Sequence, residues 1–251
     1  MRAKAGVWCW MAVLVWGLLC ISAGATDDAP TVLEVGRFSA GRPGMAHTDG
    51  WKPLAFKKIP VPTAYELVLD ADTVVVKATS NASASGLIKE VKIDPSTFPV
   101  VRWRWKIENV LSRSDVTRKA GDDYPARLYI TFEYDPNKVS FGKKLKYQAG
   151  KVLFGDIPIA ALNYIWDTKT AVGTIVDNAY TDFAKMIVVE SGGAKVGGWV
   201  EESRNVFADY RQAFGEDPPL INGVAIMTDT DNTKERAVAY YGDIRFVRTG
   251  S

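Results

Sequence analysis

The sequence of 251 residues contains only two cysteines and one histidine. Both cysteines, Cys9 and Cys20, lie among the first 25 residues, so the remaining 226 (251 − 25) carry no thiol. Zinc–thiolate centres, thiol nucleophiles and disulfides are therefore excluded beyond that segment. The single histidine, His47, lies in a glycine-rich stretch, which argues against a histidine-based catalytic triad or a multi-histidine metal site. Phosphate-binding glycine loops, nucleophile elbows and dinucleotide fingerprints are also absent.

Long apolar runs are absent except for one near the N-terminus, Val7–Ile21. Arg2 and Lys4 precede this run, and the small residues Ala23–Ala25 follow it. This order predicts a cleaved secretory signal peptide over residues 1–25. It also predicts a periplasmic or secreted protein with no stable membrane span after cleavage. A lipid anchor or an uncleaved helical anchor is the alternative.

Charge of one sign is not in excess. The sequence has 31 basic and 29 acidic residues, and cleavage of the signal removes Arg2 and Lys4, which leaves a balance of 29 − 29 = 0. No strong attraction to nucleic acid is expected for such a chain.

Beyond residue 30 the apolar residues recur mostly with a period of two, which is typical of β-strands. The expected strands are Val32–Phe38, Tyr65–Leu69, Thr73–Thr79, Gly86–Ile93, Val100–Ile107, Ala126–Glu133, Lys185–Glu190, Gly223–Thr228 and Ala237–Val247. Only Arg204–Phe214 has convincing helical spacing, and Gly215 follows it as a C-cap. The pattern predicts a mainly β protein, a two-sheet β-sandwich or jelly roll with one or two short helices, as a single domain over residues 26–251. The least regular segment, residues 135–174, is expected to be a long insertion.

Several motifs together resemble a known family. They are Phe98–Lys106, Gly121–Phe132, Asn163–Trp166, Trp199, Arg204–Val206, Asp209–Arg211, Phe214–Gly215, Gly223–Thr233 and Ala239–Phe246. In combination they resemble a bacterial exported family known as a domain of unknown function, DUF3047, over about residues 32–247. The resemblance implies an exported β-sandwich with no assigned activity or catalytic residues. The last strand, Tyr240–Phe246, is similar to that of galactose-binding-like jelly rolls, which include carbohydrate-binding modules, and this implies an architecture more than a ligand.

Two expected strands carry polar residues that alternate with apolar ones. If Val100–Ile107 and Ala126–Glu133 pair, their polar faces coincide. The resulting face would display Arg102, Arg104, Arg127, Tyr129 and Glu133. The guanidinium group of arginine binds carboxylates and hydroxyls, so this face is a candidate site for a glycan or another anionic polar ligand. The alternative is a solvated face whose charges only tune solubility and strand pairing. On the ligand hypothesis, truncation of Arg127 should weaken binding and barely change stability. If truncation unfolds the protein instead, Arg127 is a buried structural partner of a carboxylate such as Asp122 or Asp123, and the ligand face is expected among Trp166, Trp199 and the insertion.

Acidic residues suggest a structural calcium ion at one of two places. Asp229 and Asp231 follow an expected strand with the spacing of a group of hard oxygen ligands. Glu34 on the first strand and Asp243 on the last would form a second pair if these strands are neighbours. The alternative for Asp229 and Asp231 is an Asp/Asn turn whose side chains bond to their own backbone.

Three functions remain open from the sequence. The first is a non-catalytic, exported binding or accessory protein for a glycan or an anionic small molecule. The second is a carboxylate-dependent glycan hydrolase or lyase on the same scaffold. Its carboxylates could come from Asp122, Asp123, Glu201, Glu202, Asp209 and Asp229. The third is a structural or assembly factor of the cell envelope. No set of catalytic residues can be recognised in the sequence, and this favours the first and the third function.

Overall fold

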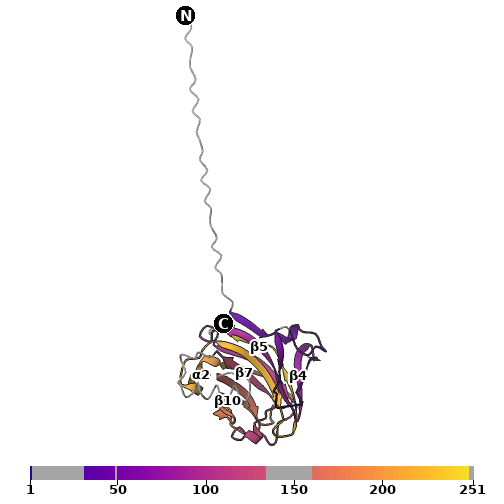
Figure 1. Ribbon diagram of the computed structural model, residues 1–251. Helices are drawn as coiled ribbons and strands as arrows, with labels where there is room; N and C mark the ends of the chain where they lie inside the picture. The colour runs from indigo at the N-terminus through magenta and orange to yellow at the C-terminus, as the bar shows by residue number, and fades with distance from the viewer. Residues whose placement is uncertain (2–30, 49, 134–159, 249–251) are drawn as a thin grey trace. The chain divides into compact units, whose positions relative to one another are not determined.

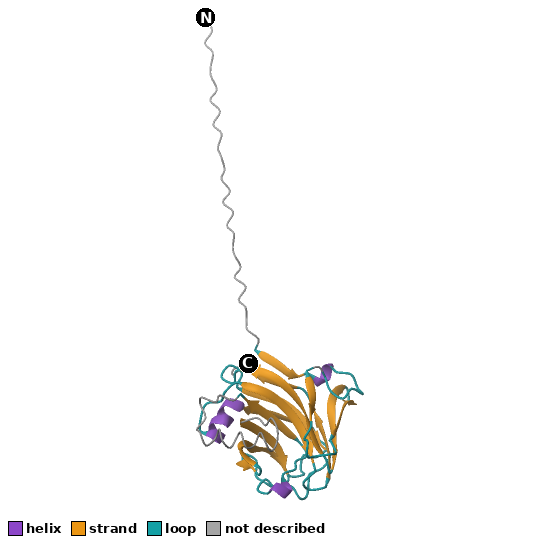
Figure 2. Ribbon diagram, in the orientation of Figure 1, coloured by secondary structure: helices purple, strands orange, loops and turns teal. Residues whose placement is uncertain are grey.

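The computed structural model describes residues 31–48, 50–133 and 160–248, together with Met1. The described residues from Thr31 onward belong to one compact unit and form two sheets (Figure 1), and strands make up most of this part of the chain (Figure 2). The predicted mainly β, two-sheet β-sandwich is therefore confirmed. The expected signal segment, residues 1–25, lies outside the described residues except for Met1. In the described part of the chain, no helix combines the length and the hydropathy that crossing a membrane requires.

The first sheet is built around β6, and all of its neighbouring strands are antiparallel. Its strands are β1 (Val32–Gly36), β3 (Ala64–Asp70), β4 (Thr73–Asn81), β6 (Val100–Ile107), β11 (Val200–Asn205), β13 (Arg236–Tyr241) and β14 (Ile244–Val247). On one side of β6 lies β11, and on the other side β14 and β13 pair with successive parts of β6. Beyond them, β1 pairs with β14, whereas β4 and then β3 continue the sheet from β13.

The second sheet has the order β2–β5–β12–β7–β8–β10–β9. These strands are β2 (Trp51–Leu54), β5 (Ala84–Ile93), β7 (Arg127–Phe132), β8 (Ala160–Asp167), β9 (Ile175–Asn178), β10 (Thr181–Ser191) and β12 (Ile221–Asp229). All neighbours are antiparallel except β8 and β10, which are parallel. The sheet therefore places β7 at its centre, between β12 and β8.

The core lies between the inner faces of the two sheets. It includes Val101, Trp103, Trp105 and Ile107 of β6, Leu128, Ile130 and Phe132 of β7, and Leu162, Tyr164 and Trp166 of β8. The ring centroids of Trp103 and Tyr164 are 5.4 Å apart, and those of Trp105 and Trp166 are 6.1 Å apart. Such aromatic contacts add to the stabilisation from apolar burial. The strands β6 and β8 thus meet face to face across the core.

The predicted helix is present as α2 (Val206–Phe214), which begins two residues later than expected because β11 continues to Asn205. The Asn205 side chain caps the helix by accepting a hydrogen bond from the Ala208 N–H at 2.9 Å, and Gly215 ends it. The short 3₁₀ helices η1 (Phe38–Ala40) and η2 (Lys119–Gly121) are the other helical turns described.

Each strand expected from period-two alternation overlaps a strand of the structure, but the last one is divided at Gly242 and Asp243 into β13 and β14. The sequence did not predict β2, β8, β9 or β11. Residues 160–167, expected to belong to a long insertion, form the interior strand β8, in which every residue is buried. A strand buried on both faces has no alternation of polar and apolar residues, so the period-two signal is missing.

Candidate functional site

The five residues predicted to share one ligand-binding face lie on two different sheets. Arg102 and Arg104 are on β6 of the first sheet, whereas Arg127 and Tyr129 are on β7 of the second, with Glu133 directly after it. The expectation that these two strands pair is wrong. β6 pairs with β11, β13 and β14, and β7 pairs with β12 and β8. The connection between the two strands crosses from one sheet to the other instead of forming a hairpin.

The outer face of the first sheet carries a group of cationic and aromatic side chains. The group consists of Arg102, Arg104, Lys106, Trp199, Tyr240 and Arg245, and we call it the arginine–tryptophan face. The guanidinium carbon of Arg104 lies 4.5 Å from the centroid of the Trp199 ring. The ammonium of Lys106 lies 4.4 Å from the centroid of Tyr240 and 5.2 Å from that of Trp199. These distances are those of cation–π contacts, so the rings and the cations hold one another in place.

Asp70 and Gly242 fix this arrangement. Asp70 accepts hydrogen bonds of 2.7 Å from both the Lys106 ammonium and the indole N–H of Trp199. These bonds, the one from Lys106 first, lower the pKa of Asp70. At Gly242, a Cβ atom would lie 2.5 Å from Cγ of Arg104, so a larger residue would displace this side chain from the strand.

Arg102 and Arg245 lie directly opposite each other on β6 and β14. Their guanidinium groups make no hydrogen bond or ion pair with any described residue. Like charges at directly opposed positions destabilise a sheet unless an anion lies between them. Ser203 on β11 and Glu34 on β1 continue the same row on either side. This row therefore ends in a carboxylate and has two unpaired arginines at its centre.

On the second sheet, Arg127 is almost completely buried, with 2% of its side chain exposed. It forms a bidentate ion pair with Asp229, in which Nε donates to Oδ1 at 2.7 Å and Nη2 donates to Oδ2. The guanidinium also donates to the Asp122 carbonyl and to the Tyr129 hydroxyl, and it lies 4.3 Å from the Tyr124 ring centroid. Burial alone lowers the pKa of Arg127, but Asp229 and its other neighbours raise it above its ordinary value. Arg127 is thus a charged structural partner of Asp229.

The connection from β6 to β7 covers one part of this outer face. Val116 and Tyr124 from that connection join a small second apolar cluster with Ile165, Met186 and Val188 of β8 and β10. Near it, the Ser114 hydroxyl donates to Asp167 at 3.2 Å and the Thr168 hydroxyl to the Leu111 carbonyl at 2.6 Å. This covering layer explains why a polar position on an alternating strand is buried.

Tyr129 and Glu133 have different surroundings. The Tyr129 hydroxyl accepts the bond from Arg127 at 3.1 Å, and burial raises the pKa of this tyrosine to about 12. Glu133 is exposed, and its backbone N–H donates to the Leu220 carbonyl at 2.8 Å. Tyr129 therefore belongs to the buried network around Arg127, and Glu133 does not.

The structure brings together two acidic motifs that are far apart in the sequence. Carboxylate oxygens of Asp123, Asp229 and Asp231 all lie within 4.8 Å of one another, and this is the one such group of three among the described residues. Asp229 binds Arg127, and Asp123 accepts hydrogen bonds from the backbone N–H groups of Asn232 and Thr233. Burial, followed by the charge of Asp123, raises the pKa of Asp231. Of the three carboxylates, that of Asp231 accepts the fewest hydrogen bonds.

The second pair of predicted calcium ligands lies on neighbouring strands, because β1 pairs with β14. Asp243, however, accepts hydrogen bonds from the backbone N–H and the hydroxyl of Ser39, both at 2.8 Å or less. Glu34 lies opposite Arg245 and is exposed. Within the described chain these two residues have no third carboxylate close enough to complete a metal-binding group.

A further pair of carboxylates lies beside the core, where the charge of Glu190 of β10 acts on Glu202 of β11. Burial, then the charge of Glu190, raises the pKa of Glu202 to about 7, and the Trp105 indole N–H donates to Glu202 at 3.3 Å. Lys195 forms an ion pair with Glu190 at 2.5 Å. Glu202 is one of the six carboxylates that the sequence offered for catalysis, whereas Glu190 was missed.

Sequence reasoning missed Tyr240 and Arg245 as parts of a site, and it named Trp199 only for the case that Arg127 proved to be buried. Tyr240 and Arg245 occupy outward positions on the last two strands, so alternation could have identified them had the break at Gly242 been known. Trp199 follows Gly197 and Gly198 in a segment without periodicity, so its signals were its place among the family motifs and an aromatic residue in a glycine-rich loop.

Solved structures with similar folds include carbohydrate-binding domains. The family 11 carbohydrate-binding module of the cellulosomal cellulase Lic26A-Cel5E of Clostridium thermocellum is 10% identical, with a TM-score of 0.42 over 88% of this chain and 96% of that one. The family 30 module of the cellulosomal cellulase Cel9D-Cel44B of the same organism is 10% identical, with a TM-score of 0.38 over 87% and 99%. The carbohydrate recognition domain of Emp47p is 12% identical, with a TM-score of 0.42 over 87% and 95%.

At the level of sequence, no curated protein matches the chain. The profile of one family matches residues 49–245, which is more than half of the chain and contains most of the motifs on which the resemblance was based. The chain therefore belongs to the family described as "Protein of unknown function (DUF3047)".

Proposed function

We propose that this chain is an exported, non-catalytic binding or accessory protein, periplasmic or secreted, that holds a glycan or another anionic polar ligand on the arginine–tryptophan face. The observation that carries the proposal is the pair of opposed, unpaired arginines, Arg102 and Arg245, on the same face as Arg104 and the Trp199 ring that Arg104 contacts. The signal-like order of residues 1–25 supports export.

The chemistry of this face suits an acidic glycan. A carboxylate placed between Arg102 and Arg245 would relieve their mutual repulsion and accept charge-assisted hydrogen bonds from both. The half-buried Trp199 ring offers an apolar surface against which a sugar ring can lie. Because Arg104 and Lys106 already hold that ring in place, little ordering would be needed on binding.

A glycan array followed by analysis of reaction products tests the proposal. We expect binding of acidic glycans without turnover. Each charge-assisted hydrogen bond is worth about 1.5–3 kcal/mol, so Arg102→Ala and Arg245→Ala should each weaken binding by about one to two orders of magnitude. Arg236→Ala, at the far end of β13, is the matched control and should leave binding unchanged.

Absence of binding across neutral and acidic glycans would contradict the proposal, as would equal affinities in Arg102→Ala and the wild type. The absence of both binding and turnover would instead favour the envelope assembly factor.

Glu202 supports a second candidate, a carboxylate-dependent glycan hydrolase or lyase. A general acid needs a pKa near the working pH, and the pKa of Glu202 is raised to about 7 beside Glu190. If the array reveals cleavage products, Glu202→Gln should abolish them, whereas Glu201→Gln, on the same strand and exposed, should not.

A further inference from the structure

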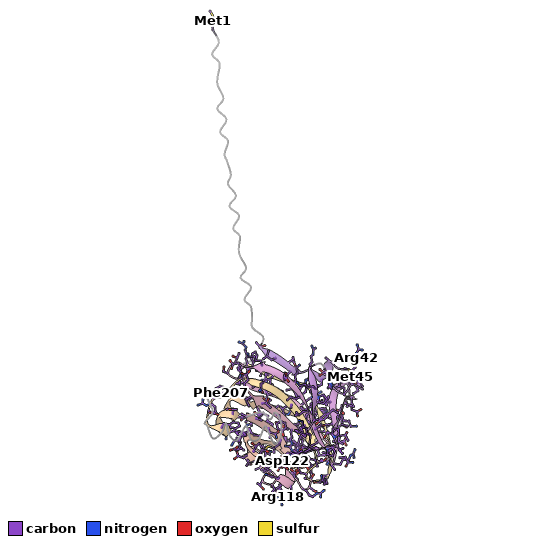
Figure 3. All side chains as sticks on the ribbon, in the orientation of Figure 1. Met1, Arg42, Met45, Arg118, Asp122 and Phe207 are labelled. Carbon is purple, nitrogen blue, oxygen red and sulfur yellow. The ribbon has the colours of Figure 1, made fainter. Side chains whose placement is uncertain are left out.

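A pocket of about 410 Å³ lies beside β1 and the loop that follows η1. Its walls include Glu34, Arg37, Arg42, Met45, Thr48 and Lys89. Arg42 and Met45 are close together at one corner of the sandwich (Figure 3). The volume is within the range of about 300–1,000 Å³ that is typical of small-molecule sites.

The loop that forms one wall is held by backbone hydrogen bonds to β3. The Gly44 N–H donates to the Leu67 carbonyl at 2.8 Å, and the Leu67 N–H donates to the Met45 carbonyl at 2.6 Å. At Gly41, a Cβ atom would lie only 2.5 Å from Cδ1 of Leu67, so a larger residue would push the loop away from the strand. The loop that forms this wall of the pocket is therefore held in place by β3.

Cationic side chains dominate the pocket. Arg37, Arg42 and Lys89 carry three positive charges against the single carboxylate of Glu34, which leaves a formal surplus of 3 − 1 = 2. The Lys89 ammonium is anchored by a 2.9 Å hydrogen bond to the Val35 carbonyl. Among the described residues, nothing forms a hydrogen bond or an ion pair with the guanidinium groups of Arg37 and Arg42. A guanidinium group without a protein partner can donate two parallel hydrogen bonds to a carboxylate or a phosphate, so two of them at one pocket suit an oxyanion.

We propose that this pocket binds the oxyanion, a carboxylate or a phosphate, of a small acidic sugar through Arg37 and Arg42. The Thr48 hydroxyl and the Glu34 carboxylate supply hydrogen-bonding groups for sugar hydroxyls, and Met45, which is 42% exposed, supplies an apolar surface for the ring. The pocket adjoins the arginine–tryptophan face at Glu34, but its arginines are different ones, and the proposal does not rest on the function proposed above.

Calorimetric titration of the protein with galacturonate, glucose 1-phosphate and neutral glucose tests this proposal. At least one of the two acidic sugars should bind, and the one that binds more tightly identifies the source of the oxyanion. Glucose should not bind. The double variant Arg37→Ala/Arg42→Ala should weaken binding by at least about tenfold. Glu34→Gln removes the opposing charge and should strengthen binding several-fold.

Two controls separate this site from the others. Arg236→Ala removes an exposed arginine elsewhere and should leave the affinity unchanged, and so should Trp199→Ala. The double variant should in turn keep its melting temperature and any binding of array glycans at the arginine–tryptophan face. Equal affinity in the double variant and the wild type would overturn the proposal, and so would the absence of binding by both acidic sugars or equally tight binding of glucose.

Discussion

The outer faces of the two sheets carry arginines at equivalent alternating positions, but the arginines have opposite surroundings. On the first sheet, Arg102 and Arg104 are half-buried, and Arg102 has no acidic partner among the described residues. On the second, Arg127 is buried and paired with Asp229, which is 102 residues away in the sequence. An alternating strand therefore reveals which residues share a face, whereas the connections that fold over that face decide whether an arginine can meet a ligand.

The same contrast changes the expected consequences of substitution. The sequence suggested that Arg127 could be truncated at little cost, because it occupies the polar face of its strand. With Asp229 buried beside it, the positive charge of Arg127 is needed to keep a buried carboxylate compensated. The four predictions below test how far the two faces differ.

The largest effect is expected for Arg127→Ala. Loss of one partner of a buried ion pair costs about 3–5 kcal/mol, because the other charge stays buried without compensation. Arg102→Ala, the matched change on the first sheet, should alter the free energy of unfolding by no more than about 0.5 kcal/mol. Urea denaturation of the two variants measures both values. Similar losses in the two variants would remove the distinction between the faces.

Calcium binding stays a prediction, and the carboxylates of the second sheet are where we expect it. An ion that binds only the folded state at a hundredfold excess over its dissociation constant adds about 2.7 kcal/mol of stability, so the melting temperature should rise by several degrees over that in chelator. Asp231→Asn should abolish this rise, whereas Asp243→Asn should not. Loss of the rise in Asp243→Asn alone would place the ion between β1 and β14, and identical melting curves with and without calcium would exclude both positions.

Glu202 is partly buried and accepts a hydrogen bond from Trp105, and it should make the free energy of unfolding depend on pH. Its pKa is raised in the folded state to about 7 from an ordinary value of 4.5. Since the folded protein then holds the proton more tightly than the unfolded chain, the contribution of Glu202 is complete below about pH 4.5 and is lost as the pH rises through about 7.

Glu202→Gln should therefore be more stable than the wild type at pH 8, by about 1–2 kcal/mol after allowance for solvent screening, and not at pH 4. Glu201→Gln, next to it on β11 but exposed, should show no such difference. Thermal melting from pH 4 to pH 8 provides the comparison. A variant whose melting curve follows that of the wild type throughout this range would show that the pKa of Glu202 is not raised.

The smallest effect concerns the contact between Arg104 and Trp199. A cation–π pair at a half-exposed position contributes about 0.5–1 kcal/mol, so a double-mutant cycle with Arg104→Ala and Trp199→Ala should give a coupling energy of that size. The cycle of Arg102→Ala with Trp199→Ala serves as the reference and should give a value near zero. Equal couplings in the two cycles would mean that Trp199 is not held by Arg104.

Local patterns in the sequence determined most of the fold. The alternation of Val101, Trp103 and Trp105 with Arg102 and Arg104 correctly indicated both the strand β6 and its buried face. The helix α2 was recognisable from its spacing and from Gly215, because caps and periodicity depend on neighbouring residues only. The family resemblance was recognisable for a similar reason, since it depends on motifs that can be read along the chain.

Only the tertiary structure decided which strands are neighbours and what covers each face. The pairing of Arg102 with Arg245, the ion pair of Arg127 with Asp229 and the approach of Asp123 to Asp231 all join residues more than 100 positions apart. A period of two specifies that a strand has two faces, but it carries no information on the sheet to which the strand belongs. The sequence could therefore name the arginines, and only the path of the chain between the sheets separated those that lie on the surface from the one that is buried.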